Sequence, residues 1–468
     1  MAKAPTKPRQ KRPQLPIIEV DITQLNDDGL GCGRHEGREV LVPGALPGER
    51  VAAEVIHAGQ RRLGTRLRRV ITAHPERVAP PCPCARNCQG CPLIQLAYPA
   101  QLRFKEERVR QALAEHQTLR RVKVAPIWGT PEPLGYRSNA KLVFGRERGE
   151  LRLGLYRRGS HEVVDVGDCP LHHPLINRIV QVVREEVRRQ EVFVFDPKKR
   201  RGLLRYLAVK VSPALGKAMV TFVAAERNYR EITHLAKWLK TKVPEVVSVQ
   251  LNVNPTEGNA VFGRETLRIL GTPDLIDQVG ELRLRIAPNS FFQVNNAQAA
   301  RIYALVRDWA ALTQAETAVD LYCGIGGITL NLARDAGKVI GIEMVEDAVR
   351  NARENARMNS LGNCTFLAGD AAELMEDLAS EVPPGGVAVV NPPRSGCDLS
   401  VLKTLVGLQP RTLLYVSCDP RTLARDLALL AERGYRTETV QPVDMFPQTP
   451  HVESVARLVP DSLHKDLI

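Results

Sequence analysis

The sequence predicts a multi-domain protein that joins a small N-terminal β-barrel, a central α+β subdomain and a C-terminal α/β domain with a doubly wound, Rossmann-like sheet. The chain has 468 residues, which corresponds to about three domains of roughly 150 residues each. Short alternating apolar runs fill its beginning, and strand and helix patterns alternate from Asn296 onward. We predict a disordered basic tail (1–14), the barrel (15–75), the central subdomain (76–285) and the α/β domain (286–468).

The composition is typical of a folded protein, with 44% hydrophobic and 25% charged residues. There is no run of about 18 apolar residues, so we expect no membrane span. The first residues, MAKAPTKPRQKRPQLP, lack the apolar stretch of a secretory signal. The sequence therefore predicts a cytoplasmic protein.

Charge is distributed unevenly along the chain. The net charge is +13, and residues 286–468 carry −6, so residues 1–285 carry +19. This separation indicates a front half that binds a polyanion, most simply nucleic acid, attached to a near-neutral or acidic catalytic half. The alternative is a set of solvated basic faces that bind nothing.

Residues 15–75 contain four short alternating runs, which are IIEVDI, REVLVPG, ERVAAEVI and TRLRRVI. Glycine-rich turns separate them, a pattern that predicts a small antiparallel barrel. Its arginines favour an RNA-binding module over the alternative of a structural lid.

Four of the ten cysteines lie within ten residues, at Cys82, Cys84, Cys88 and Cys91, and Cys169 follows later. Without an export signal a disulfide framework is not expected, so the cluster predicts a metal site. Four thiolates suit a [4Fe–4S] cluster, and they equally suit tetrahedral zinc. Spacing alone leaves both metals open, and Cys84 is a fifth candidate ligand.

The central region, residues 76–285, begins with a helical stretch, LAYPAQLRFKEERVRQALAEH, and continues in short strand-like runs such as LLRYLAVKVSP and VVSVQLNVNP. This style predicts an α+β subdomain with a mostly antiparallel sheet.

A glycine loop follows the first strand of the C-terminal domain, in AVDLYCGIGGITL. Gly324 lets the backbone approach a ligand, and Glu343, nineteen residues later, is placed to accept hydrogen bonds from ribose hydroxyls. A dinucleotide would need the same features, but the loop lacks the last glycine of the G-x-G-x-x-G fingerprint. Its form resembles S-adenosylmethionine-dependent methyltransferases, in which the position of Asp370 contacts the adenine.

Four further motifs complete the pattern: SFFQVN at 290–295, VVNPPRSG, LYVSCDPRTLARDL and MFPQTPHVESVARL. Together they resemble the RNA 5-methyluridine methyltransferase family over nearly the whole chain. The resemblance is greatest to bacterial 23S ribosomal RNA uracil-5 methyltransferases, which join a TRAM domain to an iron–sulfur subdomain. The bacterial transfer RNA enzyme lacks both features, which makes tRNA the weaker alternative.

This resemblance implies roles for individual residues. It implies cofactor contacts at Gln293 and Tyr322 besides Gly324, Glu343 and Asp370. Asn391 stands where the family more often has Asp, and we include it among the cofactor-binding residues. The implied ligands of a [4Fe–4S] cluster are Cys82, Cys88, Cys91 and Cys169.

Uracil methylation explains the remaining motif residues, because carbon-5 of uracil is a poor nucleophile. Addition of a thiolate to carbon-6 activates it, and a base must later remove the carbon-5 proton. The resemblance implies Cys418 as this nucleophile and Glu453 as this base. Cys323 and Cys397 are expected only to pack.

Two other functions stay open at this point. Asn391-Pro-Pro also occurs in amino-group methyltransferases, although the pairing of Cys418 with Glu453 argues against that chemistry. The chain could also be a non-catalytic RNA-binding assembly factor that keeps the fold. We expect an RNA substrate, no membrane association and no obligate protein partner.

Overall fold

The computed structural model describes residues 16–88, 90–258, 260–378 and 382–461. The described residues form two compact units, one of residues 16–100 with 448–450 and one of residues 101–447 with 451–461. The cysteine segment thus belongs to the same unit as the barrel. The basic tail predicted for 1–14 lies outside the described residues.

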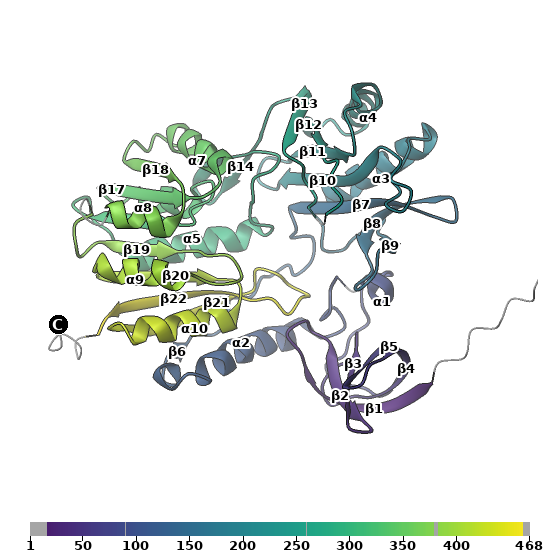
Figure 1. The fold of residues 1–468 in the computed structure, drawn as a ribbon, viewed down its shortest axis with the longest axis horizontal. Coiled ribbons are helices and arrows are strands. Elements are labelled where there is room, and N and C mark those ends of the chain that lie inside the picture. Colours follow the sequence, from purple (N-terminus) through teal and green to yellow (C-terminus); the bar gives the residue numbers. More distant parts are fainter. Residues whose placement is uncertain (1–15, 89, 259, 379–381, 462–468) are drawn as a thin grey trace, which may run out of the picture. The chain divides into compact units, whose positions relative to one another are not determined.

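The first unit contains a closed five-stranded barrel in the order β1-β2-β3-β5-β4 (Figure 1). Alternate residues fill its interior, among them Val20, Ile22, Val40 and Val42, each at most 3% exposed. The elements are β1 (Ile17–Leu25), β2 (Gly31–His35), β3 (Arg38–Val42), β4 (Arg50–Ala58) and β5 (Arg62–Thr72), followed by α1 (Ala85–Cys88).

One strand pair of the barrel differs from the antiparallel prediction. Strands β3 and β5 run parallel, while the other neighbouring pairs are antiparallel. The reason is geometric: direction cannot alternate all the way around a closed ring with an odd number of strands. The barrel is confirmed, and its purely antiparallel character is wrong.

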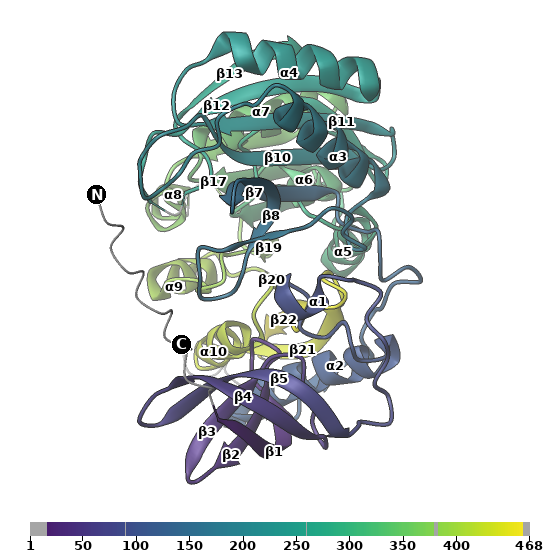
Figure 2. The same cartoon turned by 90° about the vertical axis from the view of Figure 1, so that its right-hand side faces the viewer.

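Helix α2 (Tyr98–Ala114) starts in the first unit and continues into the second, which contains two large sheets. The first is seven-stranded, in the order β13-β12-β11-β10-β7-β8-β9, and only β11 and β12 pair in parallel. Helices α3 (Pro174–Arg189) and α4 (Tyr229–Lys242) pack on one face of it (Figure 2). The strands are β7 (Asn139–Glu147), β8 (Glu150–Tyr156), β9 (Val163–Asp165), β10 (Leu204–Ser212), β11 (Lys217–Ala224), β12 (Val246–Val253) and β13 (Glu265–Gly271).

The second sheet has the order β18-β17-β16-β19-β20-β22-β21-β6, and its first five strands are parallel. The chain leaves β16 first to one side and then to the other, so the predicted doubly wound domain is confirmed. The strands are β6 (Lys123–Val124), β16 (Thr317–Leu321), β17 (Lys338–Glu343), β18 (Cys364–Ala368), β19 (Val387–Val390), β20 (Thr412–Ser417), β21 (Tyr435–Val443) and β22 (Glu453–Pro460).

Helices cover both faces of this parallel sheet. Successive side chains of a strand point to opposite faces, so the apolar side chains on each face need a covering layer. Ala318 of β16 packs in one core with α5, α6 and α7, and its neighbour Val319 packs in a second core with α8, α9 and α10. The helices are α5 (Asn296–Ala310), α6 (Gly327–Leu332), α7 (Glu346–Met358), α8 (Ala371–Leu378), α9 (Leu399–Gly407) and α10 (Pro420–Ala431). The short hairpin of β14 (Leu275–Val279) and β15 (Leu282–Ile286) precedes α5. Over the described residues, no helix has the length and apolarity needed to cross a membrane.

Candidate active site

The carboxyl ends of the parallel strands meet at one edge of the eight-stranded sheet. The strand order reverses between β16 and β19, and ligands of such sheets bind in the crevice at this point. The backbone N–H of Asn391, just after β19, donates to the carbonyl of Leu321 at the end of β16, at 3.2 Å. The topology thus brings to this edge the predicted residues Tyr322, Gly324, Glu343, Asp370, Asn391 and Cys418.

The loop after β16 has unusual backbone geometry. Tyr322, Gly324 and Gly326 all have positive φ, at 62°, 57° and 90°. For tyrosine this conformation is uncommon and costs energy. A Cβ atom added to Gly324 would meet nothing within 4 Å, so its backbone borders open space that a ligand can fill. At Gly327 a Cβ would lie 2.6 Å from Tyr303 Oη, so this glycine is needed for packing.

Glu343 connects the first two loops of this edge. Its Oε2 accepts from the N–H of Gly324 at 3.0 Å, and its Oε1 accepts from the N–H of Val345 at 2.9 Å. The carboxylate therefore lies beside the glycine loop, where the prediction of a ribose acceptor needs it. Asp370 follows β18 and accepts from the N–H of Ala372 at 2.8 Å, which makes it the cap of α8 as well.

Sequence analysis missed Asp320, the residue of β16 two positions before the loop. It is fully buried, and burial raises the pKa of its carboxyl to about 7. Oδ2 accepts from Thr329 Oγ1 at 2.6 Å, whereas Oδ1 is buried and has no hydrogen-bond partner among the described residues. A buried acceptor without a donor beside a glycine cradle fits a ligand that brings N–H or O–H donors, as S-adenosylmethionine does. The feature of the sequence that could have identified Asp320 was the acidic residue within the apolar strand of AVDLYCG, just before the glycine loop.

The segment before α5 holds the predicted residue Gln293. Its carbonyl accepts from Ser138 Oγ at 3.4 Å, and that of Val294 accepts from the same atom at 3.2 Å, which fastens the segment to β7's N-terminal end. Gln293 is half-buried, and Phe291 is 77% exposed. An exposed aromatic side chain two residues from a predicted cofactor contact was not singled out from the sequence.

Cys418 and Glu453 come together through strand register. Strands β20 and β22 are antiparallel, and Ser417 pairs with Ser454. The next opposing positions are therefore Cys418, directly after β20, and Glu453, the first residue of β22. Glu453 also pairs with Val443 of β21 on its other side, so it lies inside the sheet and is only 4% exposed.

Burial and charge set the electrostatics of this pair. Burial raises the pKa of Glu453 to about 8, and the positive charge of Arg394 opposes this rise. Burial also raises the pKa of the Cys418 thiol, and Glu453 adds to the shift, whereas Arg394 lowers it by charge and by a hydrogen bond. The two groups thus share one cation. A carboxyl with a pKa near neutrality is suited to proton transfer.

Arg394 is the second functional residue that sequence analysis missed. It lies in the loop after β19, in the string VVNPPRSG, and its guanidinium interacts with both Cys418 and Glu453. The arginine of this motif could have been singled out from the sequence as a candidate functional residue. A cation beside a cysteine favours the reactive thiolate.

The other cysteines near this edge differ from Cys418. Cys323 is 8% and Cys397 5% exposed, and burial raises the pKa of both thiols, that of Cys397 to about 12. Cys418 is half-buried and has Arg394 beside it, so it is the best suited of the three to act as a nucleophile.

A buried ion pair fastens the segment that leads from β21 toward Glu453. Lys105 of α2 and Asp444 are both fully buried and bonded to each other, and Lys105 Nζ also donates to the carbonyl of Phe446 at 2.9 Å. Tyr136 Oη donates to the carbonyl of Pro447 at 3.1 Å. Removing one partner of such a pair leaves an uncompensated buried charge, so this segment is held firmly.

The predicted metal ligands lie in two units of the chain. Cys82, Cys88 and Cys91 belong to the unit of the barrel, and Cys169 belongs to the other. Within the part of the chain that the structure describes, no three His, Cys, Asp or Glu side chains are grouped so that they could hold a metal ion. Burial raises the pKa of the Cys169 thiol. The structure gives the iron–sulfur cluster no support, and the cluster stays a prediction.

Comparison with known proteins identifies the family. Residues 16–62 match the TRAM domain, residues 312–382 a methyltransferase domain, and residues 385–459 the tRNA (uracil-5-)-methyltransferase family. An uncharacterized RNA methyltransferase of Geobacter sulfurreducens is 49% identical over 97% of this chain and 91% of its own. The chain belongs to the RNA uracil-5 methyltransferase family. It is therefore a methyltransferase with an RNA substrate, and the barrel is its TRAM domain.

Other relatives of this uracil-5 methyltransferase agree with that assignment. An uncharacterized RNA methyltransferase of Halalkalibacterium halodurans is 38% identical over 94% of this chain and 96% of its own. Among solved structures, the tRNA (uracil-54, C5)-methyltransferase of Pyrococcus abyssi in complex with S-adenosyl-L-homocysteine superposes with a TM-score of 0.76. It is 28% identical and covers 94% of this chain and 100% of its own. That relative was solved with S-adenosyl-L-homocysteine, the demethylated form of S-adenosylmethionine.

Proposed function

We propose that this enzyme transfers a methyl group from S-adenosylmethionine to carbon-5 of a specific uridine in 23S ribosomal RNA, with Cys418 as nucleophile and Glu453 as base. One observation carries the proposal: Cys418, directly after β20, lies opposite Glu453, the first residue of β22, and Arg394 interacts with both. Transfer to an amino group requires neither a thiol nor a base next to it. The pair therefore favours uracil carbon-5 over the amino-group alternative.

Each group of the chain has a defined task in this reaction. The Cys418 thiolate forms a bond to carbon-6, and the electron pair of the carbon-5–carbon-6 double bond moves onto the uracil carbonyl as an enolate. S-adenosylmethionine, when bound, would supply the methyl group that carbon-5 takes up, and it would leave as S-adenosylhomocysteine. Glu453 takes the carbon-5 proton, the double bond returns, and the Cys418–carbon-6 bond breaks. Arg394 stabilises the thiolate before addition and after elimination.

Cofactor and base would meet at the crevice between β16 and β19. For the cofactor, this crevice offers the open space beside Gly324 and the carboxylates of Glu343 and Asp320. Around them lie Tyr322, Asp370 and Asn391. The target uridine must leave its stack to reach Cys418. Phe291, which is 77% exposed beside Gln293, offers an aromatic surface for the extruded base.

The choice between ribosomal and transfer RNA rests on different observations. The TRAM domain joined to a cysteine segment resembles the bacterial 23S enzymes. However, the Pyrococcus abyssi tRNA enzyme matches 94% of this chain, so the overall architecture does not separate the two substrates. Methylation of tRNA is therefore the second candidate function, and this relative is the observation that favours it.

Mapping of 5-methyluridine decides between the two RNAs. The purified enzyme, incubated with S-adenosylmethionine and either 23S rRNA or total tRNA from a strain lacking its gene, is expected to methylate one or a few uridines in the rRNA only. Nuclease mapping and mass spectrometry locate the product, and the Cys418→Ala variant provides the blank. Stoichiometric methylation of tRNA with unmodified rRNA would reassign the substrate to tRNA.

We further propose, on the resemblance alone, a [4Fe–4S] cluster on Cys82, Cys88, Cys91 and Cys169. No step of the reaction uses it, because uracil methylation requires no electron transfer. Its role would be structural or in holding RNA.

Metal analysis tests the cluster directly. Protein purified without oxygen is expected to be brown and to contain about four irons per chain. Cys88→Ser is expected to lose the iron and much of the soluble yield, because metal binding and folding are coupled. Cys84→Ser is the matched control and is expected to keep the metal. Stoichiometric zinc, or protein without metal that methylates RNA normally, would disprove the cluster.

A further inference from the structure

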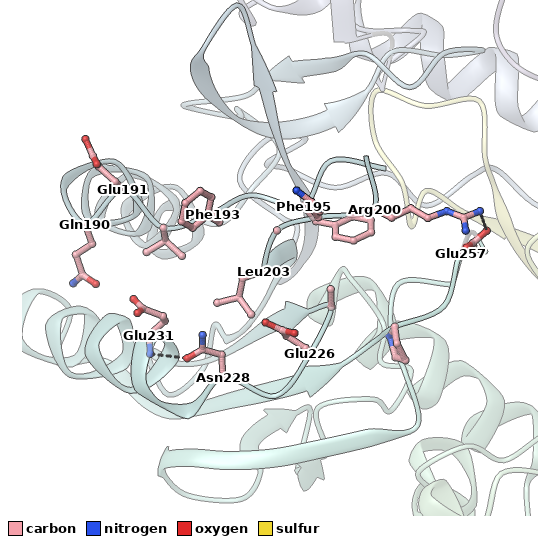
Figure 3. Close-up of a pocket in the computed structure, with 15 residues that line it drawn as sticks. Gln190, Glu191, Phe193, Phe195, Arg200, Leu203, Glu226, Asn228, Glu231 and Glu257 are labelled. Atoms are coloured by element: carbon pink, nitrogen blue, oxygen red, sulfur yellow. Dashed lines mark hydrogen bonds and ion pairs between the residues drawn. The ribbon is translucent and has the colours of Figure 1, made fainter. Parts of the chain in front are cut away.

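A pocket of about 640 Å³ lies in the subdomain of the seven-stranded sheet (Figure 3). It is formed by the loop between α3 and β10, residues 190–203, together with the start of α4. None of its lining residues belongs to the candidate active site. Its volume is in the range of small-ligand sites.

One side of the pocket presents two aromatic rings. Phe193 is 78% exposed, while its neighbours Val192 and Val194 are buried. The carbonyl of Phe193 accepts from the N–H groups of Leu203 and Leu204 at 2.9 and 3.0 Å. A large apolar ring is therefore held outside the core on an anchored backbone.

The second ring, Phe195, makes a cation–π contact with an arginine of the protein. The guanidinium of Arg205 lies 4.8 Å from its ring centre. Arg205 is itself buried and donates to the carbonyls of Asn254 and Thr256, both at 2.6 Å. The aromatic side of the pocket is thus preorganised before any ligand arrives.

The opposite side carries hydrogen-bond acceptors. Figure 3 shows Glu226, Asn228 and Glu231 facing the aromatic side across the pocket. Asn228 Oδ1 accepts from the N–H of Glu231 at 3.1 Å, which fixes the turn that places these carboxylates. Carboxylates only accept hydrogen bonds, so they select a flat ring whose edge carries N–H donors.

Cations flank the pocket on the same loop. Lys198, Lys199 and Arg201 are exposed, and Asp196 Oδ1 accepts from the N–H groups of Lys198 and Lys199 at 2.9 and 3.3 Å. Arg200 is paired with Glu257 at 2.9 Å. A run of lysine and arginine attracts phosphates and repels a basic peptide.

We propose that this pocket binds one unpaired nucleobase of the RNA substrate, stacked on Phe193, with its amino group donating to Glu226 or Glu231 and its flanking phosphates on Lys198, Lys199 and Arg201. The base is one whose edge carries an amino group that can donate to a carboxylate, which cytosine, adenine and guanine all have. Uracil is disfavoured because its carbonyl oxygens would face the carboxylates. The site is a second RNA contact besides the methylated uridine, and it depends only on RNA being the substrate.

Binding of short single-stranded RNA tests the proposal without any methylation step. Fluorescein-labelled 12-mers of cytidine and of uridine are titrated into the full-length protein, with anisotropy as the readout. The wild type is expected to prefer the cytidine 12-mer. Phe193→Ala is expected to weaken its binding at least about 5-fold, the lower end of what one stacked base contributes. Phe193→Trp should retain binding and show tryptophan quenching by the RNA.

Two further variants separate the carboxylates from general effects. Glu226→Gln combined with Glu231→Gln is expected to remove the preference for cytidine over uridine. Tyr229→Ala is the matched control, because Tyr229 is 50% exposed in the same subdomain but does not line the pocket. Melting temperatures confirm that each variant is folded.

Three results would overturn the proposal. The first is unchanged affinity of Phe193→Ala for the cytidine 12-mer. The second is a cytidine preference that survives in the double glutamine variant. The third is an octa-arginine peptide that binds the wild type, loses binding in the double variant and leaves RNA affinity untouched, since this would assign the pocket to a basic protein partner. Each outcome is independent of whether Cys418 methylates uridine.

Discussion

Replacing Cys418 with alanine is expected to abolish methylation, by at least on the order of 10⁴-fold, because carbon-5 of uracil is then never activated. The fold should tolerate the change, since Cys418 is half-buried in a loop and lies outside the two cores of the sheet. S-adenosylmethionine affinity and RNA binding serve as controls and should stay close to the wild-type values.

A trapped intermediate locates the nucleophile. RNA with fluorine at carbon-5 of the target uridine can be attacked and methylated, but it has no carbon-5 proton for Glu453 to remove, so elimination stops. The wild type should therefore form a protein–RNA adduct that resists denaturation and requires S-adenosylmethionine. Cys323→Ala and Cys397→Ala are matched controls and should form it too. An adduct that persists in Cys418→Ala, or a peptide linked at Cys323 or Cys397, would falsify the assignment.

Replacing Glu453 with glutamine should give a different defect. Addition and methyl transfer can proceed, but glutamine cannot accept the carbon-5 proton, so the enzyme should accumulate adduct on ordinary uridine. Turnover is expected to fall about 10²- to 10⁴-fold, the usual contribution of a general base. Denaturing gels quantify the adduct, and product release is followed separately. A variant that turns over normally, or that forms no adduct at all, contradicts this role.

The pH dependence of the wild type follows from the same carboxyl. Because burial raises the pKa of Glu453 to about 8, its basic form increases as the pH rises toward that value, and elimination should accelerate in parallel.

The free energy of unfolding should change in the opposite direction. The folded state holds this proton more tightly than the unfolded state, so the Glu453 contribution is complete below about pH 4.5 and is lost as the pH rises through about 8. Glu453→Gln should flatten this part of a melting-temperature profile.

Local pattern was sufficient for the architecture. Alternating apolar runs such as IIEVDI became barrel strands, in which alternate residues such as Val20 and Ile22 are buried in the barrel interior. Continuous apolar runs such as TLLYVS became inner strands of the parallel sheet, since helices cover both of its faces. The antiparallel prediction was wrong only for β3 and β5, whose pairing depends on how many strands close the ring and not on either strand's own residues.

By itself, the sequence determined the strands, the glycine loop and the candidate side chains at strand ends, because these depend on residues close together along the chain. Only the tertiary structure decided which of them share a site. Cys418 and Glu453 are 35 positions apart, and it is the register of β20 against β22 that sets them opposite each other. Arg394 joins them from another loop, and Asp320 is buried because helices cover both faces of the sheet that contains β16. Burial and proximity are properties of packed elements, which is why a raised pKa such as that of Glu453 cannot be derived from local sequence.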